Sequence, residues 1–316
     1  NSGRAKITGF TSATVVAATT QVNFADTSAK TDWKLGAFSG TTGHPSCVSF
    51  FEQRLVFAGT IAEPQTLYFS KAGDYENMTT GTNADDAMVY TIASNQVNRI
   101  RYLKSVRTLI VGTTGGEFTV SADGTDAAIT PTNIVIKKQS SYGTANVDAI
   151  PAGNSILFLQ KAKRKIRELS YNFDTDGYVA PDLTILNDIV TKSGITEMSY
   201  QQEPDSILWC VRDDGVFAGL TYLRSEEVVA WHRHIIGGSF GSGNAVVESV
   251  ASISGELTED QLWVIVKRTI NGATKRYVEC FADFDINEET STDFRFLDSH
   301  LTYSGSSTTT LSGLSH

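Results

Sequence analysis

Cysteine, long apolar runs and positive charge are scarce in this sequence of 316 residues. The 3 cysteines, Cys47, Cys210 and Cys280, lie far apart and form no C-x-x-C pair, so we expect buried thiols. No apolar run approaches the roughly 18 residues that a membrane helix needs, so we expect no membrane insertion. With 26 Lys and Arg against 35 Asp and Glu, the net charge of −9 argues against an extended nucleic-acid-binding face. An acidic channel through which DNA merely passes is compatible with this charge.

The residues that are present indicate a folded chain made of strands. A hydrophobic fraction of 41% supplies a sizeable core, and a charged fraction of 19% is not that of a disordered chain. Helical spacing of apolar residues is nearly absent, whereas Thr, Val, Ile and aromatic residues form runs bounded by Gly, Asn, Asp and Ser. We therefore predict an all-β protein.

An apolar run, a short polar turn and a second run recur five times. The predicted strand pairs are 54–60 with 65–70, 107–112 with 117–121, 155–160 with 165–170, 206–211 with 216–220, and 261–267 with 275–280. Leucines aligned in their first strands lie 54, 48, 51 and 54 residues apart, from Leu55 through Leu109, Leu157 and Leu208 to Leu262. This period is typical of propeller blades, and further strands predicted at 98–103, 133–137, 195–201, 228–232 and 246–253 bring each unit toward four strands.

The repeat predicts a β-propeller of about five blades over residues 44–290, with parts of a flanking β domain at both ends. Residues 1–43 form part of that flanking domain, with a strand pair at 6–20, and residues 291–316 begin a further β domain. A single blade cannot bury both of its apolar faces alone, so blades must stack. A pair of unrelated β-sandwiches is the alternative that the repeat leaves open. We expect the sequence to be a piece of a longer polypeptide.

Long runs of sequence carry a resemblance to a known family. In order, they contain an R-L-x-F hairpin, an Asp-rich segment, an S-N-x-x-N-x-I strand and a G-x-E-x-x-V hairpin. The runs are TDWKLGAFSGTTGHPSCVSFFEQRLVFAGT (31–60), PQTLYFSKAGDYENM (64–78), YTIASNQVNRIRYL (90–103), GGEFTVSADG (115–124), SILFLQKAKRKIRELSYNFDTDGYVAPDLTIL (155–186) and YQQEPDSILWCVRDDGVFAGLTYLRSEEVVAWHRH (200–234). Over roughly residues 43–281 the chain resembles the tail nozzle, or tail tubular B-type, proteins of short-tailed double-stranded DNA phages. The tail FLDSHLTYSGSSTTTLSGLSH looks like the start of the β domain that follows the propeller in such proteins.

The resemblance implies a structural virion protein that performs no catalysis and uses no cofactor. It implies a nozzle ring, commonly a hexamer, that forms the channel for DNA retention and ejection. Implied partners are further copies of the chain, the portal-adaptor ring, tail fibre or spike proteins, and passing double-stranded DNA without sequence recognition. The implied location is the phage tail of the virion, after assembly in the host cytoplasm.

Two other functional classes remain open. One is a propeller glycoside hydrolase, which needs two carboxylates about 5 to 9.5 Å apart across a sugar. The other is a glycan-binding host-recognition module, which would expose an aromatic side chain such as Trp33, Trp209 or Trp263. Trp209 and Trp263 each follow a leucine in the first strand of a pair, so we expect both to pack between blades.

Basic residues cluster at one predicted hairpin turn. The cluster contains Lys161, Lys163, Arg164, Lys165 and Arg167. It is the candidate surface for a subunit or adaptor interface or for DNA contact. A solvated hairpin tip is the alternative, and the turn lacks the interleaved aromatic residues that single-strand binding prefers.

Two short patterns are weak candidates for chemistry. Residues 237–241 match the G-x-S-x-G nucleophile pattern around Ser239, but loop formers follow where the pattern needs a helix. His232 and His234 stand two apart on a predicted strand, so their rings share one face, but a third metal ligand is missing. We expect neutral histidines packed beside Trp231.

Two acidic loops, at 174–177 and 283–289, are candidate calcium-binding sites. The second begins D-x-D-x-N, but Glu288 stands where such loops have Gly, and Phe294 stands where they have a bidentate Glu. Asp and Gly are also good turn formers. We therefore predict no catalytic, cofactor-binding or metal-binding residues.

Overall fold

The computed structural model describes residues 3–29, 31, 36–94, 97–124, 127–254, 259–282 and 305–310. This part of the chain is nearly all β, as predicted, and its helical content is one 3₁₀ turn, η1 (Arg224–Glu226). No helix within these ranges has the length and apolar character that a membrane crossing requires. The chain divides into two compact units, residues 1–41 and 42–316. The domain boundary predicted near residue 43 and the β domain predicted from 291 stay predictions.

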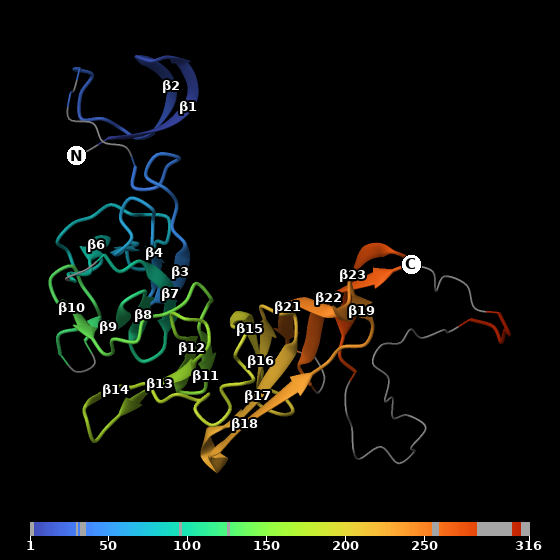
Figure 1. Cartoon of the computed structure of the whole chain (residues 1–316). Helices are drawn as coiled ribbons and strands as arrows, with labels where there is room; N and C mark the ends of the chain where they lie inside the picture. The colour runs from blue at the N-terminus through green and yellow to red at the C-terminus, as the bar shows by residue number, and fades with distance from the viewer. Residues whose placement is uncertain are drawn as a thin grey trace. The chain divides into compact units, whose positions relative to one another are not determined.

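The first unit contains an antiparallel hairpin of β1 (Arg4–Ser12) and β2 (Val15–Val22), which corresponds to the predicted strand pair at 6–20 (Figure 1). Its side chains are almost all exposed, including Ile7 and Phe10. A two-stranded hairpin of this kind has no core of its own.

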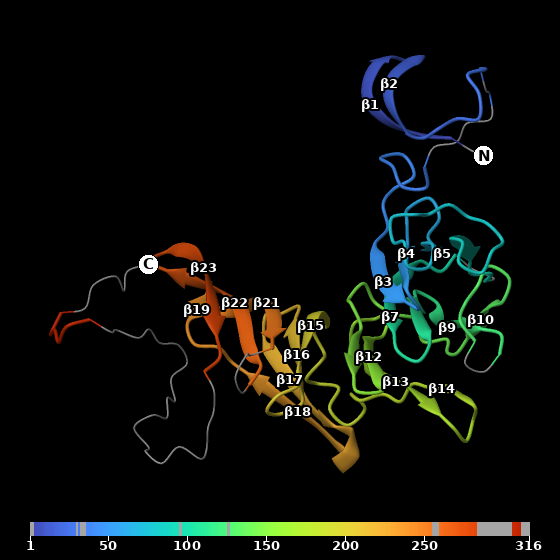
Figure 2. The same ribbon diagram turned by 180° about the vertical axis from the view of Figure 1, so that it is seen from behind.

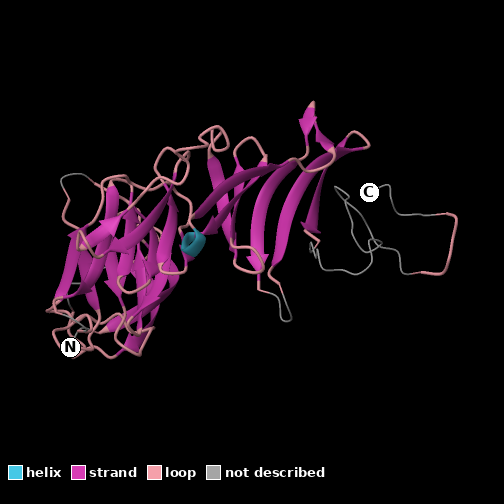
Figure 3. Ribbon diagram, turned by 90° about the horizontal axis from the view of Figure 1, so that it is seen from below, coloured by secondary structure: helices cyan, strands magenta, loops and turns pink. Residues whose placement is uncertain are grey.

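Over its described residues the second unit contains five antiparallel sheets of three or four strands, and in each sheet the strands are neighbours in chain order. Figure 3 shows these residues as groups of strands joined by loops. The first sheet is β3 (Cys47–Phe51), β4 (Arg54–Ala58), β5 (Thr66–Phe69) and β6 (Met88–Thr91). The second is β7 (Ile100–Ser105), β8 (Leu109–Thr113), β9 (Gly116–Ala122) and β10 (Ile134–Lys138). The third is β11 (Ile150–Ala152), β12 (Ser155–Leu159), β13 (Ile166–Asn172) and β14 (Gly177–Val179).

The last two sheets continue the pattern. The fourth is β15 (Ile195–Gln201), β16 (Ile207–Arg212), β17 (Phe217–Leu223) and β18 (Val228–His234). A small hairpin, β19 (Ser239–Phe240) with β20 (Gly243–Asn244), precedes the fifth sheet, which has β21 (Val246–Ile253), β22 (Gln261–Ile270) and β23 (Ala273–Cys280). All five predicted strand pairs are antiparallel neighbours, namely β4 with β5, β8 with β9, β12 with β13, β16 with β17, and β22 with β23.

Consecutive sheets pack face to face through apolar clusters, and the sheets follow in chain order in both views (Figures 1 and 2). The four clusters contain, from the first to the last pair of sheets, Val56 with Leu109, Ile110 with Phe158, Leu159 with Leu208, and Trp209 with Val264. The second, third and fourth sheets are therefore covered on both faces. This explains why β8 and β12 are buried along their whole length instead of alternating.

The two outermost sheets each carry an apolar face on which no other described sheet packs. On the first sheet this face, the first end face, contains Val48, Phe50, Leu55 and Val89, and Phe50 is 59% exposed. On the fifth sheet the last end face consists of Ala251, Ile253, Trp263, Ile265 and Val278, and Val278 is 69% exposed. Among the described residues, no apolar cluster contains both the first and the fifth sheet.

Three observations about single side chains qualify the sequence analysis. Leu109, Leu208 and Leu262 face the preceding sheet, but Leu157, which is aligned with them in the repeat, faces the following one. Trp263 was expected between blades and lies on the last end face instead, because the fifth sheet has no neighbour on that side among the described residues. Cys280 was expected to be buried, but it lies on the edge strand β23 and is exposed.

The difference in thiol burial predicts a difference in reactivity. Burial raises the pKa of Cys47 and of Cys210 above the usual value, and thiolates are the reactive form. We expect Ellman's reagent to modify Cys280 rapidly in the folded chain, and the other two cysteines only after unfolding. Counting released thionitrobenzoate before and after adding denaturant measures this, and a Cys280→Ser variant supplies the control. Rapid modification of that variant in its folded state would contradict the burial.

Candidate functional site

The structure divides the predicted basic cluster into two parts. Lys161, Lys163, Arg164 and Lys165 are exposed on the turn between β12 and β13, and Lys165 forms an ion pair with Asp182 at 2.7 Å. Arg167 is only 9% exposed and lies within β13. The turn itself stays a predicted contact for DNA or a partner protein.

Arg167 is held by three neighbours on the side of the third sheet. Its Nε donates a hydrogen bond to Gln160 Oε1 at 2.8 Å, and its Nη1 donates to the carbonyl oxygen of Ala180 at 2.6 Å. The guanidinium carbon lies 3.5 Å from the ring centroid of Tyr142, which is the geometry of a cation–π contact. Arg167 therefore fixes the position of Tyr142 relative to β14 and the residue that follows it.

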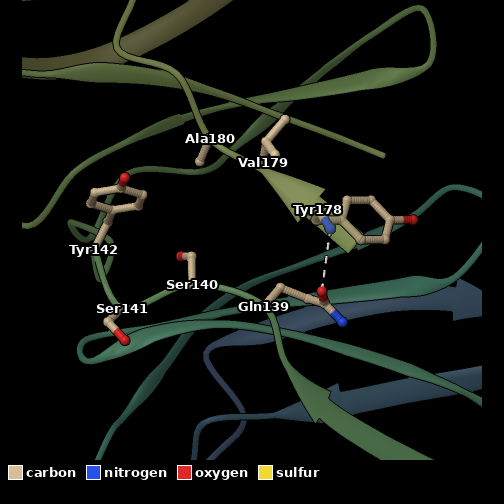
Figure 4. A pocket seen from close by; sticks show the side chains of 7 residues that line it. All are labelled: Gln139, Ser140, Ser141, Tyr142, Tyr178, Val179 and Ala180. Carbon is tan, nitrogen blue, oxygen red and sulfur yellow. Dashed lines mark hydrogen bonds between the residues drawn. The ribbon is translucent and has the colours of Figure 1, made fainter. Parts of the chain in front are cut away.

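A pocket of about 470 Å³ lies where the segment after β10 meets β14. It is lined by Gln139, Ser140, Ser141, Tyr142, Tyr178, Val179 and Ala180 (Figure 4). Gln139 bridges the two sheets, because its Oε1 accepts a hydrogen bond from the backbone N–H of Tyr178 at 3.3 Å and its Nε2 donates to Thr119 Oγ1 at 2.8 Å. Tyr178 is braced by Thr108, whose hydroxyl lies 3.1 Å from the Tyr178 hydroxyl.

A buried carboxyl group lies behind this pocket. Glu117 in β9 is fully buried, and its Oε2 accepts a hydrogen bond from the hydroxyl of Ser140. Its Oε1 has no hydrogen-bond partner among the described residues. Burial raises the pKa of Glu117, while Ser140 and the charge of Arg167 act in the opposite direction.

The two histidines share one face of β18, as predicted. His232 Nδ1 lies 2.7 Å from His234 Nε2, so one ring donates a hydrogen bond to the other. They pack beside Trp209 and not beside Trp231, whose indole N–H donates to the carbonyl oxygen of Leu183 instead. Gly219 lies opposite His232, and a Cβ at this position would collide with the imidazole ring. No group of three metal-ligating side chains occurs among the described residues.

The histidine pair makes stability depend on pH. Burial lowers the pKa of both imidazoles, and the neighbouring His232 lowers that of His234 further. The unfolded chain therefore binds more protons than the folded chain once the pH falls below the ordinary histidine value of about 6.5. We expect the free energy of unfolding to decrease between about pH 7 and pH 5 because of this pair.

Urea unfolding of a His232→Gln, His234→Gln double variant measures that contribution. The variant should lose this part of the pH dependence, whereas a variant of the exposed His44, His44→Gln, should keep it. An unchanged pH dependence in the double variant would contradict the interpretation.

The remaining sequence candidates do not form sites in the described chain. Ser239 lies in the hairpin of β19 and β20, and no helix follows it within residues 241–254, so the nucleophile elbow is absent there. The loop at 174–177 is a turn in which Asp176 Oδ1 accepts a hydrogen bond from the Tyr171 hydroxyl at 2.7 Å. The loop at 283–289 and Trp33 lie outside the described residues.

Sequence reasoning missed the residues around the pocket. The G-x-E-x-x-V motif contains Glu117 but does not indicate a pocket, and no pattern in the sequence marks Tyr142 or Tyr178 as pocket residues. A usable signal was the single carboxylate in the apolar run at 116–122, because a charge within a buried strand needs partners. Nothing in the local sequence indicates that the segment after β10 meets β14.

Comparison of the sequence with protein-family models gives no match, and comparison with curated proteins gives none. Among solved structures, the chain is similar to an auxiliary nutrient-binding protein from Bacteroides thetaiotaomicron, with 12% identity and a TM-score of 0.37 over 76% of this chain. The match spans 57% of the length of that protein. A luciferin-regenerating enzyme is similar at 13% identity and a TM-score of 0.27, over 71% of this chain and 83% of that protein.

Proposed function

We propose that this chain is a structural subunit of a phage tail nozzle, and that its five sheets are blades of a propeller. The supporting observation is that two polar residues of the motifs that carry the resemblance are buried and hydrogen-bonded. Arg54 of R-L-x-F and Glu117 of G-x-E-x-x-V are buried and hydrogen-bonded to neighbouring segments of the same sheets or to the loops that follow them. Such residues serve a rigid body, which is what a ring subunit under mechanical load requires.

The end faces support a role in an assembly. Monomeric proteins rarely leave large contiguous apolar patches exposed, and such patches usually mark interaction surfaces. In the proposed nozzle the stack of sheets closes into a propeller of about five blades, and this closure covers both end faces. Copies of the closed body form the ring beneath the portal and adaptor.

The charge of the chain fits a conduit for DNA. A net charge of −9 keeps phosphates from adhering, so DNA can slide along a wall that a basic protein would hold. The exposed basic turn at 161–165 is then the contact for an adjacent ring or for DNA. The proposed role needs neither a catalytic residue nor a cofactor, and its location is the virion.

Electron microscopy of the full chain, alone and with its particle, tests the proposal together with mass photometry. A ring with an axial channel at the tail tip is the expected result. Phe50→Glu on the first end face should reduce ring formation, whereas Phe173→Glu, at a more exposed phenylalanine on a turn, should not. A dispersed monomer that never joins a particle would overturn the proposal.

A further inference from the structure

We propose that the pocket between the second and third sheets binds a neutral saccharide, with the ring of Tyr142 packing against the sugar. The pocket, about 470 Å³ in volume, falls within the roughly 300–1,000 Å³ of small-molecule sites. In the close view, Tyr142 and Tyr178 lie on opposite sides with Ser140 between them (Figure 4). The inference does not rest on ring assembly.

The chemistry of the lining defines the ligand class. It consists of tyrosine rings, hydroxyl groups, one amide and two small apolar residues, and it contains no charged side chain. A charged ligand would lose its hydration there without gaining a counter-charge on the lining. A sugar matches this lining, because its C–H faces pack on aromatic rings while its hydroxyls both donate and accept hydrogen bonds.

Hydrogen-bonding capacity remains available in the pocket. The hydroxyls of Ser141 and Tyr142 make no hydrogen bond with the described residues. Ser140 donates to Glu117 and keeps its lone pairs as acceptors for a ligand hydroxyl. Three neighbouring residues of one short segment thus present polar groups beside an aromatic ring.

The pocket walls are held in place before a ligand arrives. Arg167 stacks on Tyr142 and donates a hydrogen bond to the carbonyl oxygen of Ala180, so it links the two walls. Glu117 holds Ser140 from the second sheet, and Gln139 holds the backbone of Tyr178. Arg167 and Glu117 are accordingly positioning residues, and a prearranged wall reduces the entropy that binding costs.

Saturation-transfer NMR on the full chain tests the proposal with glucose, galactose, mannose and N-acetylglucosamine as probes. We expect saturable binding of at least one of them, with a dissociation constant of about 1 mM. Glucuronate and glucose 6-phosphate should bind about tenfold more weakly, because they bring a charge that the lining does not pair. The absence of saturable binding for all four neutral sugars overturns the proposal, and so does equal binding of the charged ones.

Variants assign the binding to this pocket. Tyr142→Ala should weaken binding of the best sugar about tenfold, and Tyr142→Phe should restore most of it because the ring remains. Tyr75→Ala, at a tyrosine of similar exposure that packs on Phe50 of the first sheet, is the matched control and should bind normally. Unchanged binding by Tyr142→Ala overturns the assignment, and thermal unfolding of each variant verifies its fold.

The same chemistry can come from a free sugar or from the end of a surface glycan. A neutral polysaccharide that contains the best sugar distinguishes the two. Retention of the chain on immobilised polysaccharide, released by the monosaccharide, indicates a glycan end. Binding of the monosaccharide alone indicates a free sugar. A chain that forms rings but binds none of these probes would overturn this inference and leave the proposed function intact.

Discussion

Replacing Arg54 by methionine is expected to lower the free energy of unfolding by about 3 kcal/mol or more. Arg54 is 2% exposed and lies in β4 of the first sheet. Its Nη1 donates to the carbonyl oxygens of Ser70 at 2.8 Å and Asp86 at 2.7 Å, and its Nη2 donates to that of Ala84 at 2.7 Å. Methionine fills much of the volume but leaves these carbonyls without donors, and unpartnered buried acceptors are costly.

Urea unfolding monitored by circular dichroism measures the effect. Arg233→Met, the same change on the exposed side of β18, should alter stability by less than about 0.5 kcal/mol. Arg54→Lys should fall between the two, because one ammonium group cannot reach all three carbonyls. A loss below about 1 kcal/mol for Arg54→Met would contradict the role given to this fork of hydrogen bonds.

The sheets could be predicted because strand patterns are local and repeat. Runs such as those of β8 and β12 are apolar along their whole length and end at turn formers, which is enough to place strands and their hairpins. The spacing near 50 residues then indicates how many units exist. The prediction of an all-β chain with five recurring hairpins was therefore correct.

The orientation of single side chains could not be predicted from the same pattern. A strand changes face with each residue, so an uncertainty of one position in the repeat exchanges the two faces. Leu157 shows this, because it was aligned with Leu109 but faces the opposite neighbour. The burial of Arg167 could not be predicted either. Its side chain is buried through contacts with Gln160, Ala180 and Tyr142, whereas the basic residues of the turn are exposed.

The candidate pocket could not be predicted from the sequence, because its two walls come from segments that are far apart in the chain. Its two walls, the segment after β10 and the strand β14, are separated in the chain by residues 143–177 and meet through Gln139 and Arg167. No periodic pattern encodes such a meeting of loops. The buried Glu117 was the only local signal.

Trp209 and Trp263 occupy equivalent places in the repeat, and their replacement by alanine is expected to have very different effects. Trp209 is buried, stacks on Phe217 with ring centroids 4.9 Å apart, and donates a hydrogen bond to Gln201 Oε1 at 2.9 Å. Trp209→Ala should lower the free energy of unfolding by about 3–5 kcal/mol, because it leaves a large cavity between two sheets. It should also weaken the pH dependence of His232 and His234, since Trp209 covers both rings.

Trp263→Ala supplies the matched comparison, because Trp263 follows Leu262 as Trp209 follows Leu208, but lies on the last end face, on which no other described sheet packs. In the isolated chain it should cost less than about 1 kcal/mol. In the proposed nozzle that face is covered, so the same variant should lose stability when assembled and form rings less readily. Equal costs for both variants in isolated monomers, measured by urea unfolding, would contradict an uncovered fifth sheet. A small cost that persists in the assembled particle would instead mean that the last end face is not where the assembly closes.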